Sequence, residues 1–335
     1  MNVGLIIPAD TPPTGGNSIS ARRVKEGLQS EGLHADTVLY QDHLPSFDIY
    51  HGWNANRVGV QLVRHGINPH RMVVTWTGTD LWQDWVADYR PIADALDDVA
   101  CQVVFTDDAR TRILDDKPGW ADRIHVISPS VNEQIFAPSP TAIPLPHPLV
   151  LLAGGVRPVK RSAWAIDLVE ATREATEIDI HMAVAGPVRH LGEWGIVKSK
   201  ASGNPWVHLL GEVPKEEMPD WYNAADVVIN TSAVEGVSNA LLEALACGSL
   251  VLCSNIAGNR YLVENGANGL LFSDEEEFVH QLTEALKGGE FVRKMRLEAR
   301  QRVLARHSLQ LEVAAYRSLY DHCQFLVAEP KSCSR

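Results

Sequence analysis

The sequence predicts an α/β protein built from two doubly wound domains, each with a parallel sheet covered by helices. Three observations carry this prediction. Short apolar runs alternate with amphipathic stretches, a proline-rich segment interrupts the alternation, and the 335-residue chain is longer than one hydrophobic core usually serves. We therefore expect two Rossmann-like domains that face each other across a cleft. Parallel sheets of this kind bind ligands at the carboxyl ends of their strands, so the ligand is expected in that cleft.

The first half of the chain contains short aliphatic runs that are bounded by polar or turn residues, which is typical of buried strands. The predicted strands are Val3–Ile7, Ala35–Tyr40, Asp48–His51, Met72–Thr75, Gln102–Thr106 and Ile124–Ile127. Between some of them, apolar residues recur at helical spacing. The predicted helices are Ser18–Ser30, Ala55–His65 and Asp107–Asp115.

The segment Ala137–Pro148 has five prolines in twelve residues and is predicted to be a linker, because proline removes a backbone donor and disfavours helix before it. The alternation then resumes. The predicted strands are Leu149–Ala153, Ile180–Ala185, Val207–Leu210, Val227–Asn230 and Leu250–Ser254. The predicted helices are Ala163–Ala175, Leu191–Ala201, Glu216–Ala224 and Asn239–Ala246. The domain boundary is therefore expected at residues 140 and 141.

Charge and cysteine content exclude several classes of protein. The chain has 42 acidic and 30 basic residues, and the excess is present in both halves. The sequence therefore gives no support for nucleic-acid binding or for attachment to anionic lipid, both of which require a basic face. The five cysteines include no C-x-x-C pair, which argues against a disulfide framework or a zinc site and favours a reducing cytoplasm. No apolar run is long enough for a membrane span, and the first residues read as a strand and not as a signal peptide.

The densest group of candidate site residues lies in Asn230–Gly258, where a strand ends in small polar residues and a Glu-Gly turn leads into a helix. Glu235 precedes this helix, and Glu243 lies two turns along it. Backbone N–H groups at a helix N-terminus attract phosphate or sugar oxygens. The residues that would supply these groups are Gly236, Val237, Ser238 and Asn239. Taken alone, the pattern is also explained by a capped helix with solvated glutamates.

This segment resembles the glycosyltransferases of the GT-B fold, specifically the retaining family known as glycosyl transferases group 1. The matching pieces are Ser232, the E-x7-E pair, L-E-A-L-A-C-G at Leu242–Gly248, I-A-G-N at Ile256–Asn259 and N-G-L-L-F at Asn268–Phe272. The resemblance covers residues 150–290 well and the first domain only loosely. The resemblance implies transfer of a hexose from a nucleotide diphosphate sugar, most simply a UDP-sugar, to an acceptor. It also implies that Glu235 binds hydroxyls of the donor sugar and that Glu243 binds hydroxyls of the nucleotide's ribose.

The resemblance also implies a division of labour. Residues 1–140 would hold the acceptor, residues 141–307 the donor, and a last helix at 308–325 would pack back on the first domain. The configuration at the sugar would be retained by front-face attack, with the leaving diphosphate helping to deprotonate the acceptor. The sequence has no D-x-D pair to hold a metal, so we expect neither a metal nor a cofactor beyond the nucleotide-sugar co-substrate.

A second cluster, Gly154–Lys160, follows a predicted strand and reads G-G-V-R-P-V-K. Glycines allow close backbone approach, and Arg157 and Lys160 could hold one anion. In the family, an Arg and a Lys at this place bind the donor diphosphate. Lys160 coincides with the family Lys, whereas Gly155 stands where the Arg usually lies. Arg157 is expected to replace it, as in the animal glycosyltransferase-1-domain-containing proteins, although surface placement of both cations is the simpler alternative.

The first domain offers three weaker candidates. Gly16, in the T-G-G-N-S loop after the first strand, is expected to reach the donor phosphate, although a plain turn capped by Ser18 is also consistent. Asp80 could accept a proton or bind an acceptor hydroxyl, or could cap a turn. His51 falls where relatives often have D-x-x-H, and it is either catalytic or structural. Many relatives carry a His where this chain has Thr77.

Other functions remain open from the sequence. The T-G-T-D-L run that contains Asp80 also resembles selenosugar synthases, which suggests transfer to a selenium or sulfur acceptor. A nucleotide-sugar epimerase and a catalytically degenerate protein that only binds sugar nucleotides share the same fold. An epimerase would convert the donor with no acceptor present, and a degenerate protein would bind it without turnover.

Overall fold

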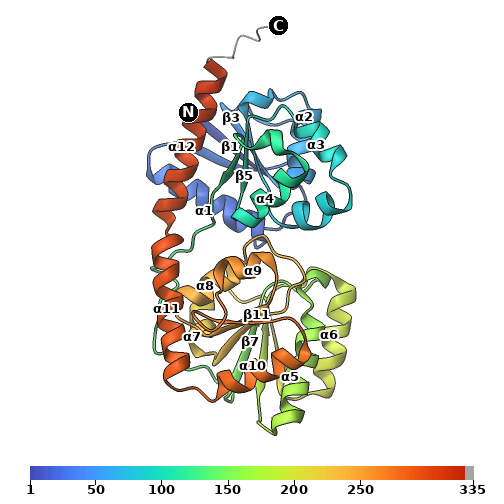
Figure 1. Ribbon diagram of the computed structural model, residues 1–335, viewed down its shortest axis with the longest axis vertical. Coiled ribbons are helices and arrows are strands. Elements are labelled where there is room, and N and C mark those ends of the chain that lie inside the picture. The colour runs from blue at the N-terminus through green and yellow to red at the C-terminus, as the bar shows by residue number, and fades with distance from the viewer. Residues whose placement is uncertain (329–335) are drawn as a thin grey trace. The chain divides into compact units, whose positions relative to one another are not determined.

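Two sheets of six parallel strands each organise the chain, and helices flank both sheets (Figure 1). The computed structural model describes residues 1–328. The chain divides into one unit of Met1–Ser130 together with the chain from Leu309, and a second unit of Val131–Ser308. The predicted fold class, two doubly wound α/β domains, is confirmed. The first boundary lies about ten residues before the predicted one.

The first unit has the strand order β2-β1-β3-β4-β5-β6. Its strands are β1 (Asn2–Ile7), β2 (His34–Leu39), β3 (Ile49–Trp53), β4 (Met72–Thr75), β5 (Cys101–Val104) and β6 (Ile124–Val126). Its helices are α1 (Gly16–Ser30), α2 (Val60–Arg64), α3 (Arg90–Leu96), α4 (Asp107–Asp116) and α12 (Leu309–Ala328). The single helix predicted over Ala55–His65 is a π-helical turn, Ala55–Gly59, that continues into α2.

Helix α12 belongs to the first unit although it lies at the end of the chain, and one buried cluster holds it there. Both carboxylate oxygens of Glu312 accept hydrogen bonds from the guanidinium of Arg23 on α1, at 2.9 and 3.1 Å. The hydroxyl of Ser130 donates a third, at 2.6 Å. The carboxylate is almost completely removed from solvent. This cluster therefore joins α12 both to α1 and to the last residue before the second unit.

The second unit has the strand order β12-β11-β10-β7-β8-β9. Its strands are β7 (Leu149–Ala153), β8 (His181–Ala185), β9 (Val207–Gly211), β10 (Val227–Asn230), β11 (Val251–Ser254) and β12 (Leu270–Phe272). Its helices are α5 (Ser162–Thr176), α6 (Leu191–Gly203), α7 (Met218–Ala224), α8 (Asn239–Ala246), α9 (Ala257–Leu262), α10 (Glu275–Leu286) and α11 (Glu290–Arg306).

The proline-rich segment Ala137–Pro148 is part of the second unit, so the prediction that it links the domains is wrong. The backbone N–H of Ser139 donates to the side-chain oxygen of Asn223 at 3.0 Å. The hydroxyl of Thr141 donates to Asp220 at 3.1 Å. These partners come from α7, and they satisfy an extended backbone that has no strand partner. Composition identified the extended conformation but not the helix that binds it.

The state of the cysteines and the character of the helices bear on two expectations drawn from composition, that the chain has no disulfide framework and no membrane span. Cys101, Cys247, Cys253 and Cys323 are buried free thiols, and Cys333 lies outside the described residues. None of the helices in the described part of the chain combines the length and apolarity that a membrane span requires.

Candidate functional site

The candidate site is built on two neighbouring strands of the second unit. Strands β7 and β10 pair in parallel, so their carboxyl ends lie at the same edge of the sheet. Strand β7 runs into Gly154, whose φ of +146° is one that side chains disfavour, and the following turn leads to Lys160. Strand β10 runs into the segment that carries Glu235. Residues 75 positions apart are thereby brought into contact.

Lys160 and Glu235 form an ion pair at this edge. The paired carboxylate oxygen also accepts hydrogen bonds from the Ser232 hydroxyl at 2.7 Å and the Asn230 amide at 3.4 Å. Burial pushes the pKa of Glu235 upward, but the charge of Lys160 and these hydrogen bonds outweigh it and hold the pKa below its ordinary value. The Lys160 and Glu235 side chains keep 16% and 10% of their surface exposed, so a ligand can reach both charges.

Arg161 fixes the backbone that carries Lys160. It adopts left-handed geometry, with φ of 50°, which is uncommon for a residue other than glycine. Its guanidinium donates to the carbonyl oxygens of Thr231 at 2.7 Å and Ser232 at 3.2 Å, and stacks over the ring of Trp164. In return, the Thr231 hydroxyl donates to the carbonyl of Lys160 at 2.9 Å. The sequence analysis did not identify Arg161, because only its backbone conformation and partners reveal its role.

Buried polar side chains support the strand β10 side of the site. The amide of Asn259, which has no exposed surface, donates to the Ser254 carbonyl at 2.9 Å and to the Asn230 side-chain oxygen at 3.3 Å. The Ser254 hydroxyl donates to the Ser232 carbonyl at 2.6 Å. The hydrogen-bond partners of Glu235 are thus themselves held by partners from β11 and α9, which orients them before any ligand binds.

The turn after Glu235 packs directly on helix α9. A Cβ atom at Gly258 would lie 2.6 Å from the carbonyl oxygen of Glu235 and 2.5 Å from that of Gly236, so no side chain fits there. Helix α8 then begins with Ser238 as its N-cap, whose hydroxyl accepts from the backbone N–H of Leu241 at 3.4 Å. Gly236, Val237, Ser238 and Asn239 thus form the approach to the N-terminus of α8, as predicted.

Glu243 lies on α8, and its carboxylate accepts a hydrogen bond from the hydroxyl of Tyr222 on α7 at 3.0 Å. Burial and then the charge of Glu243 raise the pKa of Tyr222 well above its ordinary value, so the phenol stays protonated and acts as the donor. Tyr222 was not predicted as a site residue. No sequence pattern connects it with Glu243, which lies on another helix.

The remaining cation, Arg157, is exposed immediately before the short 3-10 helix Pro158–Lys160. In the first unit, Gly16 is the first residue of α1, with open space beside its Cα atom. Both residues therefore lie at accessible loop–helix junctions, one in each unit. Within the second unit, the structure brings Lys160 and Glu235 into direct contact and leaves Arg157 outside that pair.

The structure contradicts a catalytic role for His51. Its ring has no exposed surface, and hydrogen bonds engage both nitrogens, Nδ1 with the Tyr320 hydroxyl at 2.7 Å and Nε2 with the Thr75 hydroxyl at 2.6 Å. Burial lowers the pKa of His51 to about 3. A neutral, saturated and covered imidazole cannot contact a substrate. We correct its assignment to a structural residue that packs beneath α12.

The structure likewise contradicts a catalytic role for Asp80. Its fully buried carboxylate accepts hydrogen bonds from the backbone N–H groups of Ala55 at 2.7 Å, Gly78 at 2.8 Å and Thr77 at 2.9 Å. Burial raises the pKa of Asp80 to about 6, against the effect of these hydrogen bonds. The carboxylate satisfies backbone donors of two loops and offers no surface to a substrate. We correct its assignment to the turn-capping role.

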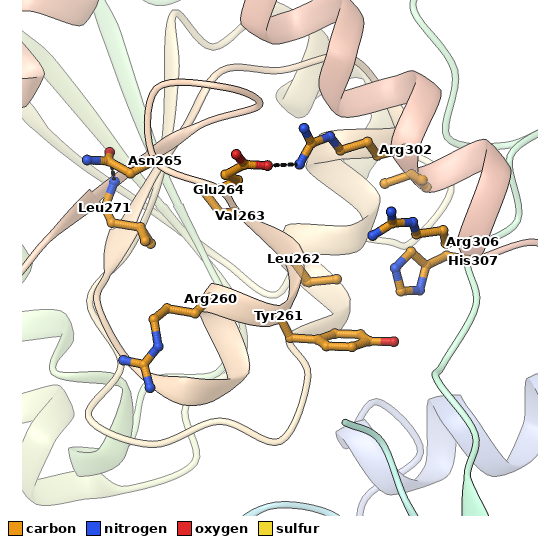
Figure 2. A pocket seen from close by; sticks show the side chains of 11 residues that line it. Arg260, Tyr261, Leu262, Val263, Glu264, Asn265, Leu271, Arg302, Arg306 and His307 are labelled. Carbon is orange, nitrogen blue, oxygen red and sulfur yellow. Dashed lines mark hydrogen bonds and ion pairs between the residues drawn. The ribbon is translucent and has the colours of Figure 1, made fainter. Parts of the chain in front are cut away.

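A cavity of about 440 Å³ in the second unit lies apart from this site, beside α9 and α11 (Figure 2). Its lining includes Arg260, Tyr261 and Arg306, and the ion pair between Arg302 and Glu264 lies across part of it. None of the predicted site residues lines this cavity. The candidate site is therefore an open strand edge and not this cavity.

Comparison with known proteins finds similarity to glycosyltransferases. The family model described as glycosyl transferases group 1 matches residues 147–288. Glycosyltransferase 1 domain-containing protein 1 of Xenopus tropicalis is 25% identical over 91% of this chain and 93% of that protein. A D-inositol 3-phosphate glycosyltransferase of Thermobispora bispora is 29% identical over 49% of this chain and 42% of that protein.

Solved structures resemble the chain over nearly its whole length. Sucrose-phosphate synthase from Thermosynechococcus elongatus has a TM-score of 0.79 at 18% identity, covering 98% of this chain and 100% of the other. Anabaena HepE, in complex with UDP and glucose, has a TM-score of 0.76 at 15% identity, covering 96% and 100%. At these identities the likeness shows the fold, which agrees with the fold predicted from the sequence.

Proposed function

We propose that this chain, whose residues 147–288 match the family model described as glycosyl transferases group 1, is a GT-B glycosyltransferase that moves a hexose from a UDP-sugar to an acceptor. The observation that carries the proposal is the accessible ion pair of Lys160 and Glu235 at the joined ends of β7 and β10. It offers a cation for a phosphate and a carboxylate for sugar hydroxyls at one place. The choice of UDP is supported by Anabaena HepE, which is similar in fold and was solved with UDP-glucose.

The donor would lie along the site in a defined direction. Lys160 and Arg157 would contact the diphosphate, together with the N-terminus of α8, where backbone N–H groups favour negative charge. The Glu235 carboxylate would accept hydrogen bonds from hydroxyls of the hexose. Glu243, oriented by Tyr222, would accept hydrogen bonds from the ribose hydroxyls. The acceptor would bind to the first unit, and Gly16 would allow the donor phosphate to approach its backbone closely.

The reaction would retain the configuration at the sugar. The bond from the anomeric carbon to the diphosphate oxygen breaks, and the acceptor oxygen bonds to the same face of that carbon. The acceptor proton passes to the departing diphosphate. The protein supplies position and fixed positive charge for the leaving group, which is worth on the order of 10²–10³ in rate for one well-placed donor. We propose that these donors suffice without a divalent metal or another cofactor.

We further propose that the enzyme works in the cytoplasm, which its free cysteines support. It needs no nucleic-acid partner under this proposal, because neither half of the acidic chain carries an excess of basic residues.

Turnover of labelled UDP-hexoses in the presence of cell-extract acceptors tests the proposal. We expect labelled product, and we expect excess EDTA to leave its rate nearly unchanged. Lys160→Ala should lower the rate by about 10²–10³, whereas Lys287→Ala should not, although Lys287 also pairs with a glutamate, at an exposed helix end. Conversion of the donor without an acceptor would instead indicate an epimerase. Loss of turnover in EDTA with recovery in Mn²⁺ or Mg²⁺ would refute metal independence.

A further inference from the structure

The turn after β7 is bordered by a second segment, the continuation of strand β8. Val156 and Val188 form a parallel bridge beyond the ends of the two strands. The backbone N–H of Val156 donates to the Pro187 carbonyl at 2.9 Å, and that of Arg189 donates to the Val156 carbonyl at 3.0 Å. The backbone of Arg189 is therefore fixed against the same glycine turn that leads to Lys160.

The side chain of Arg189 lies on Gly155. A Cβ atom at Gly155 would be 2.8 Å from Cγ of Arg189 and 3.7 Å from its Nε. Any larger residue there would displace the arginine stem. At the adjacent Gly154, a Cβ atom would lie 3.7 Å from Cε and 3.9 Å from Nζ of Lys160. Arg189 thus occupies space that a side chain at Gly155 would need, and Lys160 lies within ordinary contact distance of the adjacent Gly154.

The balance of charge shows why a second cation is needed here. Lys160 is paired with Glu235, so its charge is largely matched before a ligand arrives. A diphosphate carries more than one negative charge, which this pair alone does not neutralise. Arg157 is exposed, and fixing such a side chain on a ligand costs conformational entropy. Arg189 is half-buried, and its guanidinium can donate two parallel hydrogen bonds to phosphate oxygens.

We propose that Arg189 binds the diphosphate of the donor together with Lys160, and that Gly155 lacks a side chain to give the arginine its place. This inference rests on the proposed function, because it assumes a nucleoside diphosphate in the site. It adds a residue from the β8 side of the sheet, whereas the other diphosphate contacts proposed in the second unit follow β7 and β10.

Calorimetric titration with UDP and with uridine tests this role, because only UDP carries the diphosphate. Arg189→Ala should lower the affinity for UDP by about 10- to 100-fold and leave that for uridine unchanged. Arg189→Gln, which keeps most of the stem on Gly155, should give a similar loss and serves if the alanine variant does not fold. Arg293→Ala is the control, since it removes an exposed arginine of α11 that pairs with Glu290.

Gly155→Ala provides an independent test. Introduced alone, it should weaken UDP binding, but in combination with Arg189→Ala it should add little to the loss, because both changes remove the Arg189 side chain from its place. Unchanged UDP affinity in Arg189→Ala, beside a loss in Lys160→Ala, would overturn the inference and leave the proposed function standing. An equal loss for uridine would also overturn it. A wild-type protein that binds no UDP, GDP or ADP would contradict the proposed function itself.

Discussion

Strands β3 and β7 illustrate how two candidate residues of parallel sheets acquire different roles. His51 lies within β3 of the first unit, whereas Lys160 follows β7 of the second unit after a glycine turn, and the sequence marks both as candidates. His51 has no exposed surface and both ring nitrogens are engaged. Lys160 keeps 16% of its side chain exposed and meets one carboxylate. A sequence pattern therefore nominates a residue, and what covers its side chain decides whether it can meet a substrate.

The cover over β3 comes from the far end of the chain. Tyr316 and Tyr320 of α12 are fully buried and stack on one another, with ring centroids 6.0 Å apart. His51 stacks on Trp53 at 5.1 Å and contacts both tyrosines. Helix α12 thus completes an aromatic core around His51. The end of β7, by contrast, is followed by glycines and a cationic loop that leave it accessible.

The largest effect on stability is expected where α12 is held to the first unit. Glu312→Ala removes a buried carboxylate that pairs with Arg23, whose side chain keeps only 11% exposure, so the free energy of unfolding should fall by about 3–5 kcal/mol. The control is Glu31→Ala, which breaks the exposed pair of Glu31 with Arg317 between the same two helices and should cost about 1 kcal/mol or less. Denaturant unfolding measures both. Equal, small changes would show that the buried cluster does not hold α12.

A smaller effect is expected at the ribose end of the proposed donor site. Glu243→Ala should weaken UDP and uridine alike by about 1.5–3 kcal/mol, because a charged acceptor of ribose hydroxyls is lost. Tyr222→Phe should cost about 1 kcal/mol, since the phenol only orients the carboxylate. Calorimetry with both ligands separates the two variants. Unchanged uridine affinity in Glu243→Ala would exclude the ribose contact.

The last effect, which is the smallest near neutral pH, concerns the pH dependence of stability. The pKa of His51 is about 3 when folded and near 6.5 when unfolded, so below pH 6.5 the unfolded chain binds the additional proton. This residue should therefore lower stability as pH falls from about 6.5 towards 3, by up to about 1.4 kcal/mol per pH unit. Over part of that window Asp80, with a pKa of about 6, acts in the opposite direction. Unfolding curves measured between pH 7 and pH 5 should show that the free energy of unfolding of His51→Gln falls less steeply with pH than that of the wild type. An unchanged slope would mean that His51 is not held neutral.

Much of the architecture could be predicted because each strand is a short apolar run between turn residues. Strand β7, for example, begins and ends where the sequence places it, at Leu149–Ala153. The proline-rich segment could not be placed, because its partners Asn223 and Asp220 lie on a helix about 80 residues later. Extended backbone and linker look alike in composition. The difference lies in long-range hydrogen bonds that local patterns do not encode.

The candidate site, like the fold, could be predicted where local patterns mark it and not where it depends on long-range contacts. Lys160 and Glu235 were identified from glycine turns at strand ends, and the adjacency of β7 and β10 brings them together. Arg161, Tyr222 and Arg189 were missed because each acts through a contact with another element. Sequence patterns thus found the residues that lie at strand ends and missed the residues that hold them.

The central claim is that ligand chemistry belongs to the accessible strand end of the second unit, where Lys160 lies, and not to the covered His51 of the first unit. Titration of UDP onto the wild type, Lys160→Ala and His51→Gln tests it most directly, at neutral pH and with folding of each variant verified. We expect Lys160→Ala to lose about 10- to 100-fold in affinity, and His51→Gln to bind as the wild type does. Loss of UDP binding in His51→Gln, with Lys160→Ala unaffected, would contradict the account.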